Sequence, residues 1–120
     1  MNNKILVADD EVDARTMLKT FLEADGFQVI EAADGYDALD KTIKYSPALI
    51  IMDMAMPFMD GVNSTRAIRG HESIRETPIV GLTAYGAFYA PRAREAGCTD
   101  VLHKPIDFSK LKPFLDQYAR

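Results

Sequence analysis

The sequence predicts an α/β fold in which five parallel strands form one doubly wound sheet with helices on both faces. Short aliphatic runs alternate five times with longer segments whose apolar residues recur at helical spacing. Runs such as "KILVA" and "ALIIM" are continuously apolar, which is typical of strands buried on both faces. Strand–helix alternation of this kind favours a parallel sheet whose crossovers are right-handed.

The first half of the chain supplies three strands and two helices. In the order strand, helix, strand, helix, strand, we expect them at residues 4–8, 12–26, 27–32, 35–46 and 48–52. Gly26 stands where the C-terminal cap of the first helix belongs, because glycine readily adopts the left-handed conformation found there. Pro47 stops the second helix, since proline cannot continue one.

The second half supplies three helices and two strands. In the order helix, strand, helix, strand, helix, we expect them at residues 60–70, 77–84, 90–97, 100–104 and 108–120. Asp60 is the expected N-cap of the first of these helices. We place Pro91 in the first turn of the short helix, where its missing N–H costs nothing. Pro113 is tolerable if the last regular helix begins near Ser109 or Lys110.

The composition is that of an ordinary globular chain. With 120 residues, 48% hydrophobic and 27% charged, it can bury a core, and we expect a single domain over residues 1–120. A net charge of −4 argues against nucleic-acid binding, which relies on Lys and Arg. The lone Cys98 allows no internal disulfide and is expected to be a small buried residue. No signal peptide or apolar run of about 18 residues is present, so we expect a cytoplasmic protein that does not enter a membrane.

Residues with reactive side chains gather at the expected carboxyl ends of the strands. Asp9 and Asp10 follow the first strand, Asp53 the third, Thr83 the fourth and Lys104 the fifth. Ligands of open parallel sheets bind beyond this edge. Two carboxylates about 4 Å apart repel by about 4 kcal/mol at an effective dielectric constant near 20, so a cation is needed among them. Mg²⁺ fits, because it prefers oxygen ligands and commonly binds one or two carboxylates.

Each of these residues also has a structural interpretation. Asp53 on its own is often a turn residue, and Asp9 and Asp10 are possible caps of the first helix. Thr83 is acceptable as a β-branched strand end and Lys104 as a solvated surface lysine. Their joint position at one edge of the sheet favours a site.

The strand-end motifs are "ILVADDE", "LIIMDMAMPFMDG", "LTA" and "HKP". In order and rough spacing they resemble the motifs of response-regulator receiver domains of two-component signalling, over essentially the whole chain. We therefore expect a flavodoxin-like (βα)5 fold with strand order 2-1-3-4-5. The resemblance also implies a cis peptide bond at Lys104–Pro105, which would aim the lysine at the site.

The resemblance implies a phosphoryl-accepting site with Asp53 as nucleophile. Mg²⁺ would be bound directly by Asp10 and Asp53, with Asp9 acting through water and the backbone carbonyl of Ala55 as a further ligand. The family pattern also gives roles to two residues that would contact the phosphoryl group, the Thr83 hydroxyl and the Lys104 ammonium.

The resemblance implies the partners of the chain, and it leaves other functions open. A histidine kinase or histidine phosphotransfer protein would donate the phosphoryl group, and an unknown downstream protein would read it. The chain would be a signalling domain that catalyses its own phosphotransfer and slow dephosphorylation. Three other functions are alternatives: a Mg²⁺-dependent phosphatase, disfavoured because Ala55 replaces a general acid; a flavodoxin-like cofactor binder; and a degenerate receiver that only binds partners.

The sequence departs from many receivers at Val101, where an aromatic residue is usual. A side chain without a ring cannot report phosphorylation by swinging inward. We therefore expect the signal to pass through the Thr83 hydroxyl and the following segment, "TAYGAFYAP".

Overall fold

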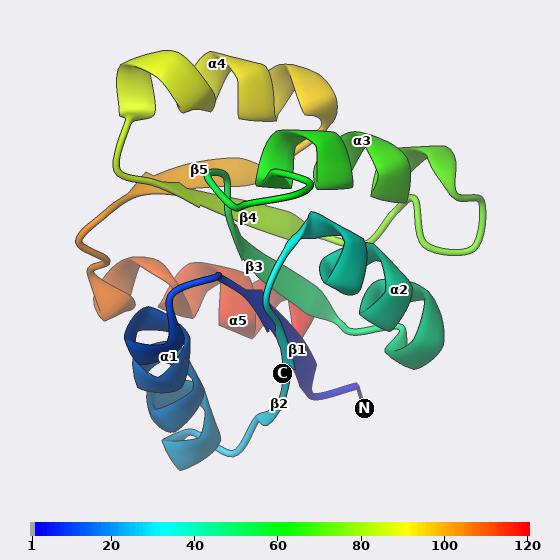
Figure 1. Ribbon diagram of the computed structural model, residues 1–120. Coiled ribbons are helices and arrows are strands. Elements are labelled where there is room, and N and C mark those ends of the chain that lie inside the picture. Colours follow the sequence, from blue (N-terminus) through cyan, green and yellow to red (C-terminus); the bar gives the residue numbers. More distant parts are fainter. Residues whose placement is uncertain (1) are drawn as a thin grey trace.

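The computed structural model describes residues 2–120, and within that range five strands and five α-helices alternate along the chain (Figure 1). The elements are β1 (Lys4–Ala8), α1 (Val12–Ala24), β2 (Gln28–Ala32), α2 (Gly35–Tyr45), β3 (Leu49–Asp53), α3 (Gly61–Gly70), β4 (Ile79–Thr83), α4 (Gly86–Ala96), β5 (Asp100–His103), the 3₁₀ turn η1 (Phe108–Lys110) and α5 (Lys112–Tyr118). None of the helices in the described range has the length and apolar character that crossing a bilayer requires.

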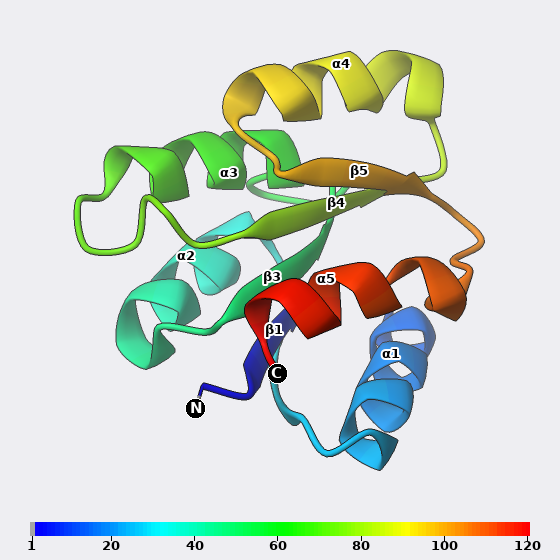
Figure 2. The ribbon, with the colours of Figure 1, turned by 180° about the vertical axis from the view of Figure 1, so that it is seen from behind.

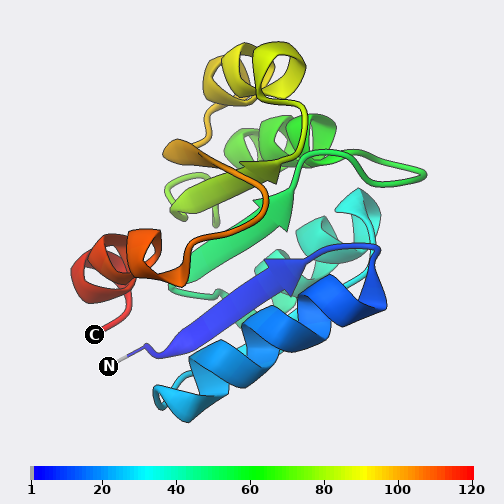
Figure 3. The same cartoon turned by 90° about the vertical axis from the view of Figure 1, so that its left-hand side faces the viewer.

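All five strands are parallel, and their order is β2-β1-β3-β4-β5, so the predicted fold class and strand order are confirmed. The register pairs Ala8 with Met52, Asp53 with Leu82 and Thr83 with His103. The carboxyl ends of the strands therefore meet at one edge, and the arrowheads visible in Figure 3 point to the same side.

The helices form a layer on each face of the sheet. Helices α2, α3 and α4 cover one face, and α1 and α5 cover the other (Figures 1 and 2). Successive strand residues point to opposite faces, so both layers receive apolar side chains from every inner strand. In β1, Leu6 and Ala8 pack under the first layer, while Ile5 and Val7 pack under the second.

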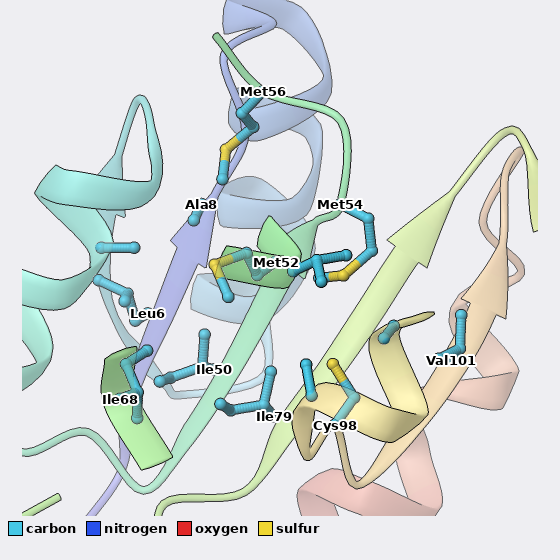
Figure 4. Close-up of a cluster of buried hydrophobic side chains, with 14 of the residues drawn as sticks. Leu6, Ala8, Ile50, Met52, Met54, Met56, Ile68, Ile79, Cys98 and Val101 are labelled. Carbon is cyan, nitrogen blue, oxygen red and sulfur yellow. The ribbon is translucent and has the colours of Figure 1, made fainter. Parts of the chain in front are cut away.

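The core beneath α2, α3 and α4 is rich in sulfur. Met52 and Met54 are fully buried and Met56 is nearly so, so the methionine-rich segment at the end of β3 packs into this core (Figure 4). Methionine suits such a place because its flexible thioether fills irregular gaps. Cys98 is buried in the same cluster, with its sulfur 3.6 Å from the Thr65 hydroxyl, as expected for a structural cysteine.

Helix ends follow the predicted signals with two exceptions. The Asp60 carboxylate accepts a hydrogen bond from the Asn63 N–H at 2.8 Å and is the N-cap of α3, as predicted. The last helix begins at Lys112 instead of Ser109 or Lys110, because those two residues belong to the η1 turn. Pro113 consequently lies in the first turn of α5, where a missing N–H is harmless.

The prediction for α4 is wrong at its start. The helix begins at Gly86, so Pro91 lies inside it instead of in its first turn. The helix continues through the proline because the turn before it is already closed, with the Tyr85 carbonyl accepting from the Tyr89 N–H at 2.9 Å. Ala90 and Ala93 are buried on either side of Pro91, whose own side chain is exposed.

Candidate functional site

A polar pocket lies at the carboxyl edge of the sheet, between the ends of β1, β3, β4 and β5. Its lining consists of Asp9, Asp10, Glu11, Asp53, Ala55, Ala84, Tyr85 and Lys104. Five of the six residues predicted to form a site belong to this lining, and Thr83 is the one that does not.

Lys104 joins the two buried carboxylates of the pocket. Its Nζ lies 2.7 Å from Asp53 Oδ2 and 3.1 Å from Asp9 Oδ2. The Lys104 N–H donates to the Thr83 carbonyl at 2.8 Å, and the predicted cis peptide at Lys104–Pro105 is present. Asp9 and Asp53 are 1% and 6% exposed, so a single ammonium offsets two desolvated negative charges. Lys104 is therefore not a solvated surface lysine.

The burial and the ion pairs shift the pKa values of Asp53 and Lys104. Burial raises the pKa of the Asp53 carboxyl, because desolvation disfavours its charged form, although the Lys104 ammonium and the Ala55 N–H act in the opposite direction. Burial alone would lower the pKa of Lys104, but its hydrogen bonds to Asp53 and Asp9 outweigh burial and raise that pKa. The raised pKa keeps the Lys104 side chain charged beside the two buried carboxyl groups.

Three carboxylates converge in the pocket. One oxygen from each of Asp9, Asp10 and Asp53 lies within 4.8 Å of the other two. Asp9 Oδ1 accepts from the Glu11 N–H at 2.9 Å and Asp53 Oδ1 from the Ala55 N–H at 3.0 Å, which orients both groups. Hard divalent cations prefer an all-oxygen donor set with excess negative charge, so these residues fit Mg²⁺.

The Thr83 hydroxyl stands behind the pocket. The side chain is 1% exposed, and its Oγ1 accepts a hydrogen bond from the Tyr85 N–H at 2.9 Å. This bond joins the end of β4 to the residue that precedes α4. A change in the position of the hydroxyl would therefore alter how α4 begins.

Two residues that shape the pocket escaped sequence reasoning. A Cβ on Gly61 would lie 2.3 Å from the Asp53 carbonyl oxygen, so only glycine fits there. Its place after Asp60 in "MDG" was a signal for a tight turn. The Arg15 guanidinium donates to the Asp9 carbonyl at 2.6 Å and pairs with Glu31, a long-range contact that no local pattern indicates.

Known proteins share this sequence pattern. The family model of the response regulator receiver domain matches residues 5–116. Sporulation initiation phosphotransferase F of Bacillus subtilis is 32% identical over 120 residues, which cover 98% of this chain and 94% of that protein. Transcriptional regulatory protein SrrA of Staphylococcus aureus is 36% identical over 107 residues, or 88% of this chain but only 43% of SrrA.

Solved structures share the fold. Chemotaxis protein CheY4 of Vibrio cholerae is 32% identical with a TM-score of 0.88, covering 98% of this chain and 99% of that one. The receiver domain of a Pseudomonas aeruginosa sensor histidine kinase is 30% identical with a TM-score of 0.91, covering 99% and 98%, and holds a magnesium ion in its active-site cleft. Sequence, fold and pocket agree: this chain belongs to the response regulator receiver family, whose members are phospho-accepting signalling domains that act with histidine kinases or phosphotransferases.

Proposed function

We propose that the Asp53 carboxylate accepts the phosphoryl group, and that residues 1–120 act as one receiver domain. The observation that carries this proposal is the ion pair of 2.7 Å between Asp53 and Lys104 inside a cluster of three carboxylates. Asp53 ends the buried strand β3 and lines the pocket, so the strand holds its carboxylate at a fixed place there. A fixed nucleophile matters because phosphoryl transfer depends mainly on positioning and on neutralising charge.

The donor is a phosphohistidine carried by a histidine kinase or a histidine phosphotransfer protein. An oxygen of ionised Asp53 attacks the phosphorus, and the bond between phosphorus and the donor nitrogen breaks. The electron pair of that bond stays on the imidazole, which leaves as a neutral ring because its other nitrogen carries a proton. The product on this chain is an aspartyl phosphate at Asp53. Because ATP charges such donors, we propose that the chain acts in the cytoplasm.

Lys104 and Thr83 complete the site. The Lys104 ammonium, which now pairs with Asp53 and Asp9, moves onto a phosphoryl oxygen and offsets its charge. The Thr83 hydroxyl has its oxygen occupied by the Tyr85 N–H, while its own proton can be donated to a second phosphoryl oxygen. The Ala84 N–H, at the pocket wall, can serve a similar purpose.

Asp10 and Asp53 would hold Mg²⁺ directly, Asp9 through water, and the Ala55 carbonyl as a further ligand. When bound, the ion neutralises charge on the phosphoryl oxygens. Asp10 is the exposed member of the carboxylate cluster, whereas Asp9 and Asp53 already share Lys104. Asp10 is therefore the carboxylate most available to a cation.

Phosphorylation with a small donor tests the acceptor. The chain is incubated with phosphoramidate and Mg²⁺, and intact-mass spectrometry should find one added phosphoryl group. Asp53→Asn should abolish the addition, while Asp60→Asn should retain it, because Asp60 caps α3. Phosphorylation that persists in Asp53→Asn would move the acceptor elsewhere.

Thermal unfolding tests the metal site separately. A cation that binds only the folded state raises the melting temperature by mass action, so Mg²⁺ should stabilise the chain. Asp10→Ala should weaken that effect. Equal stabilisation of both proteins by Mg²⁺ would remove Asp10 from the ligand set.

A further inference from the structure

Phe58 is unfavourable at its position in two respects, its backbone conformation and its exposure to solvent. Its backbone has a φ of +67°, in the left-handed region that bulky L-residues rarely adopt. Its side chain is 87% exposed, the largest value among the exposed large hydrophobic residues of the described chain. Asparagine or glycine would suit this backbone better. A phenylalanine that is strained and solvent-exposed contributes nothing to the fold that explains its presence.

The loop that carries Phe58 is tied to the pocket at both ends. It follows Asp53 in β3, and the Gly61 N–H donates to the Met54 carbonyl at 2.9 Å, which closes the loop on itself. Gly61 lies three positions after Phe58, and the chain spans at most about 3.5 Å per residue, so the two Cα atoms lie within roughly 10 Å of each other. Figure 3 shows this green loop, between β3 and α3, projecting from the carboxyl edge of the sheet.

A protein that reaches Asp53 must therefore cover Phe58. A specific interface of standard size buries roughly 800 Å² on each partner, the area of a disc about 16 Å in radius. Since Gly61 packs against the Asp53 carbonyl, Phe58 falls inside such a disc centred on the pocket. A small phosphodonor has no such extent and does not touch the Phe58 side chain.

Other exposed apolar residues follow the same edge. Within five residues of the ends of β1, β2, β3 and β4 come Val12, Tyr36, Phe58 and Tyr85, which are 55–87% exposed. The Gly35 N–H donates to the Met59 carbonyl at 2.8 Å, which places Tyr36 and Phe58 on neighbouring backbone segments. The apolar surface is thus arranged around the pocket, where a macromolecular partner binds.

We propose that Phe58 is a docking anchor for the protein that presents the phosphohistidine to Asp53. This inference rests on the proposed function, because only a donor to Asp53 must cover this loop. The partner has an apolar depression beside its phosphohistidine, into which the phenyl ring inserts. Exposed aromatic anchors of this kind commonly carry much of the energy of an interface.

Phe58→Asn separates docking from chemistry. Asparagine tolerates the left-handed backbone, so the variant should melt higher, by roughly 2–6 °C, because backbone strain is released. Its phosphorylation by phosphoramidate with Mg²⁺ should proceed at the unaltered rate. Its kcat/KM with a phosphorylated histidine kinase should fall roughly 5- to 30-fold, mainly through KM. The kinase used is the member of a purified panel that phosphorylates the unaltered chain fastest.

Tyr45→Ala is the matched control, because Tyr45 is a partly exposed aromatic residue at the opposite end of α2 from the pocket. It should leave transfer from the kinase unchanged. Equal transfer to Phe58→Asn and the unaltered chain would overturn the inference, as would a panel in which no kinase transfers at all. If Phe58→Asn changed only the self-association of the chain in gel filtration, Phe58 would contact a second copy of the chain and not the kinase, and the inference would be overturned. Failure of the unaltered chain with phosphoramidate would instead overturn the proposed function.

Discussion

Helices α3 and α4 lie side by side on one face of the sheet but are held there by different means (Figure 1). The N-terminus of α3 is capped by the Asp60 carboxylate, and the helix buries the large side chains of Val62 and Ile68. The N-terminus of α4 has no side-chain cap, and the buried residues of α4 are three alanines, Ala90, Ala93 and Ala96. An alanine offers little apolar area, so α4 gains less from packing than α3.

The two helices also differ in the hydrogen bonds that involve their backbone groups. Arg69, near the end of α3, donates at 3.0 Å to the carbonyl of Gly97, which is the C-cap of α4, and at 2.6 Å to the carbonyl of Thr77, before β4. In α4, Pro91 removes one N–H from the helical hydrogen bonds. We infer that α4 can shift at a lower cost than α3, and α4 is also the helix joined to the site through the Thr83–Tyr85 bond.

The largest expected difference comes from truncating a core residue in each helix. Ile68→Ala should lower the free energy of unfolding by about 2–5 kcal/mol, because Ile68 is fully buried and leaves a cavity. Ala93→Gly, at an equally buried site in α4, should lower it by about 1 kcal/mol. Urea unfolding measures both. Equal losses of unfolding free energy would show that the two helices are packed equally firmly, which would contradict the difference inferred between α3 and α4.

Replacing the proline of α4 should strengthen it. Pro91→Ala restores a helical N–H at an exposed position, and after the greater freedom of the unfolded chain is subtracted we expect a gain of about 2 kcal/mol. The same variant should respond less to phosphorylation, since its helix resists movement. A loss of stability in urea unfolding would mean that the surrounding structure requires Pro91.

The cap of α3 should have a smaller effect. Asp60→Ala removes the acceptor of the Asn63 N–H and should lower the free energy of unfolding by about 1 kcal/mol. Tyr85→Ala, at the corresponding position before α4, removes no side-chain cap and should change it by less than about 0.5 kcal/mol. A larger loss for Tyr85→Ala than for Asp60→Ala would reverse the ranking of the two helices.

The same two helices show how far the sequence predicts the structure. The start of α3 was predictable because Asp60 is a local N-cap signal just before a helical pattern. The start of α4 was not, because proline favours a helix start locally, whereas burial of Ala90 and Ala93 extends the helix on both sides of Pro91. Tertiary packing overrides a local signal in the second case.

A similar division holds at the site. Asp9, Asp53 and Lys104 were predictable because each follows a recognisable buried strand, and parallel strands bring their ends together. The left-handed backbone of Phe58 and the bond from Arg15 to the Asp9 carbonyl were not. Backbone strain and long-range side-chain contacts follow from the folded arrangement and leave no local pattern.

We propose that the phosphoryl signal leaves the site through Thr83 and α4. Its most direct test is an NMR comparison of backbone amide shifts before and after adding beryllofluoride, a phosphoryl mimic, with Mg²⁺. Outside the pocket, the largest changes should fall on residues 84–91, with small changes at Val101, and Thr83→Ala should remove most of them. Changes concentrated in α2 and α3, with residues 84–91 unaffected, would contradict the account.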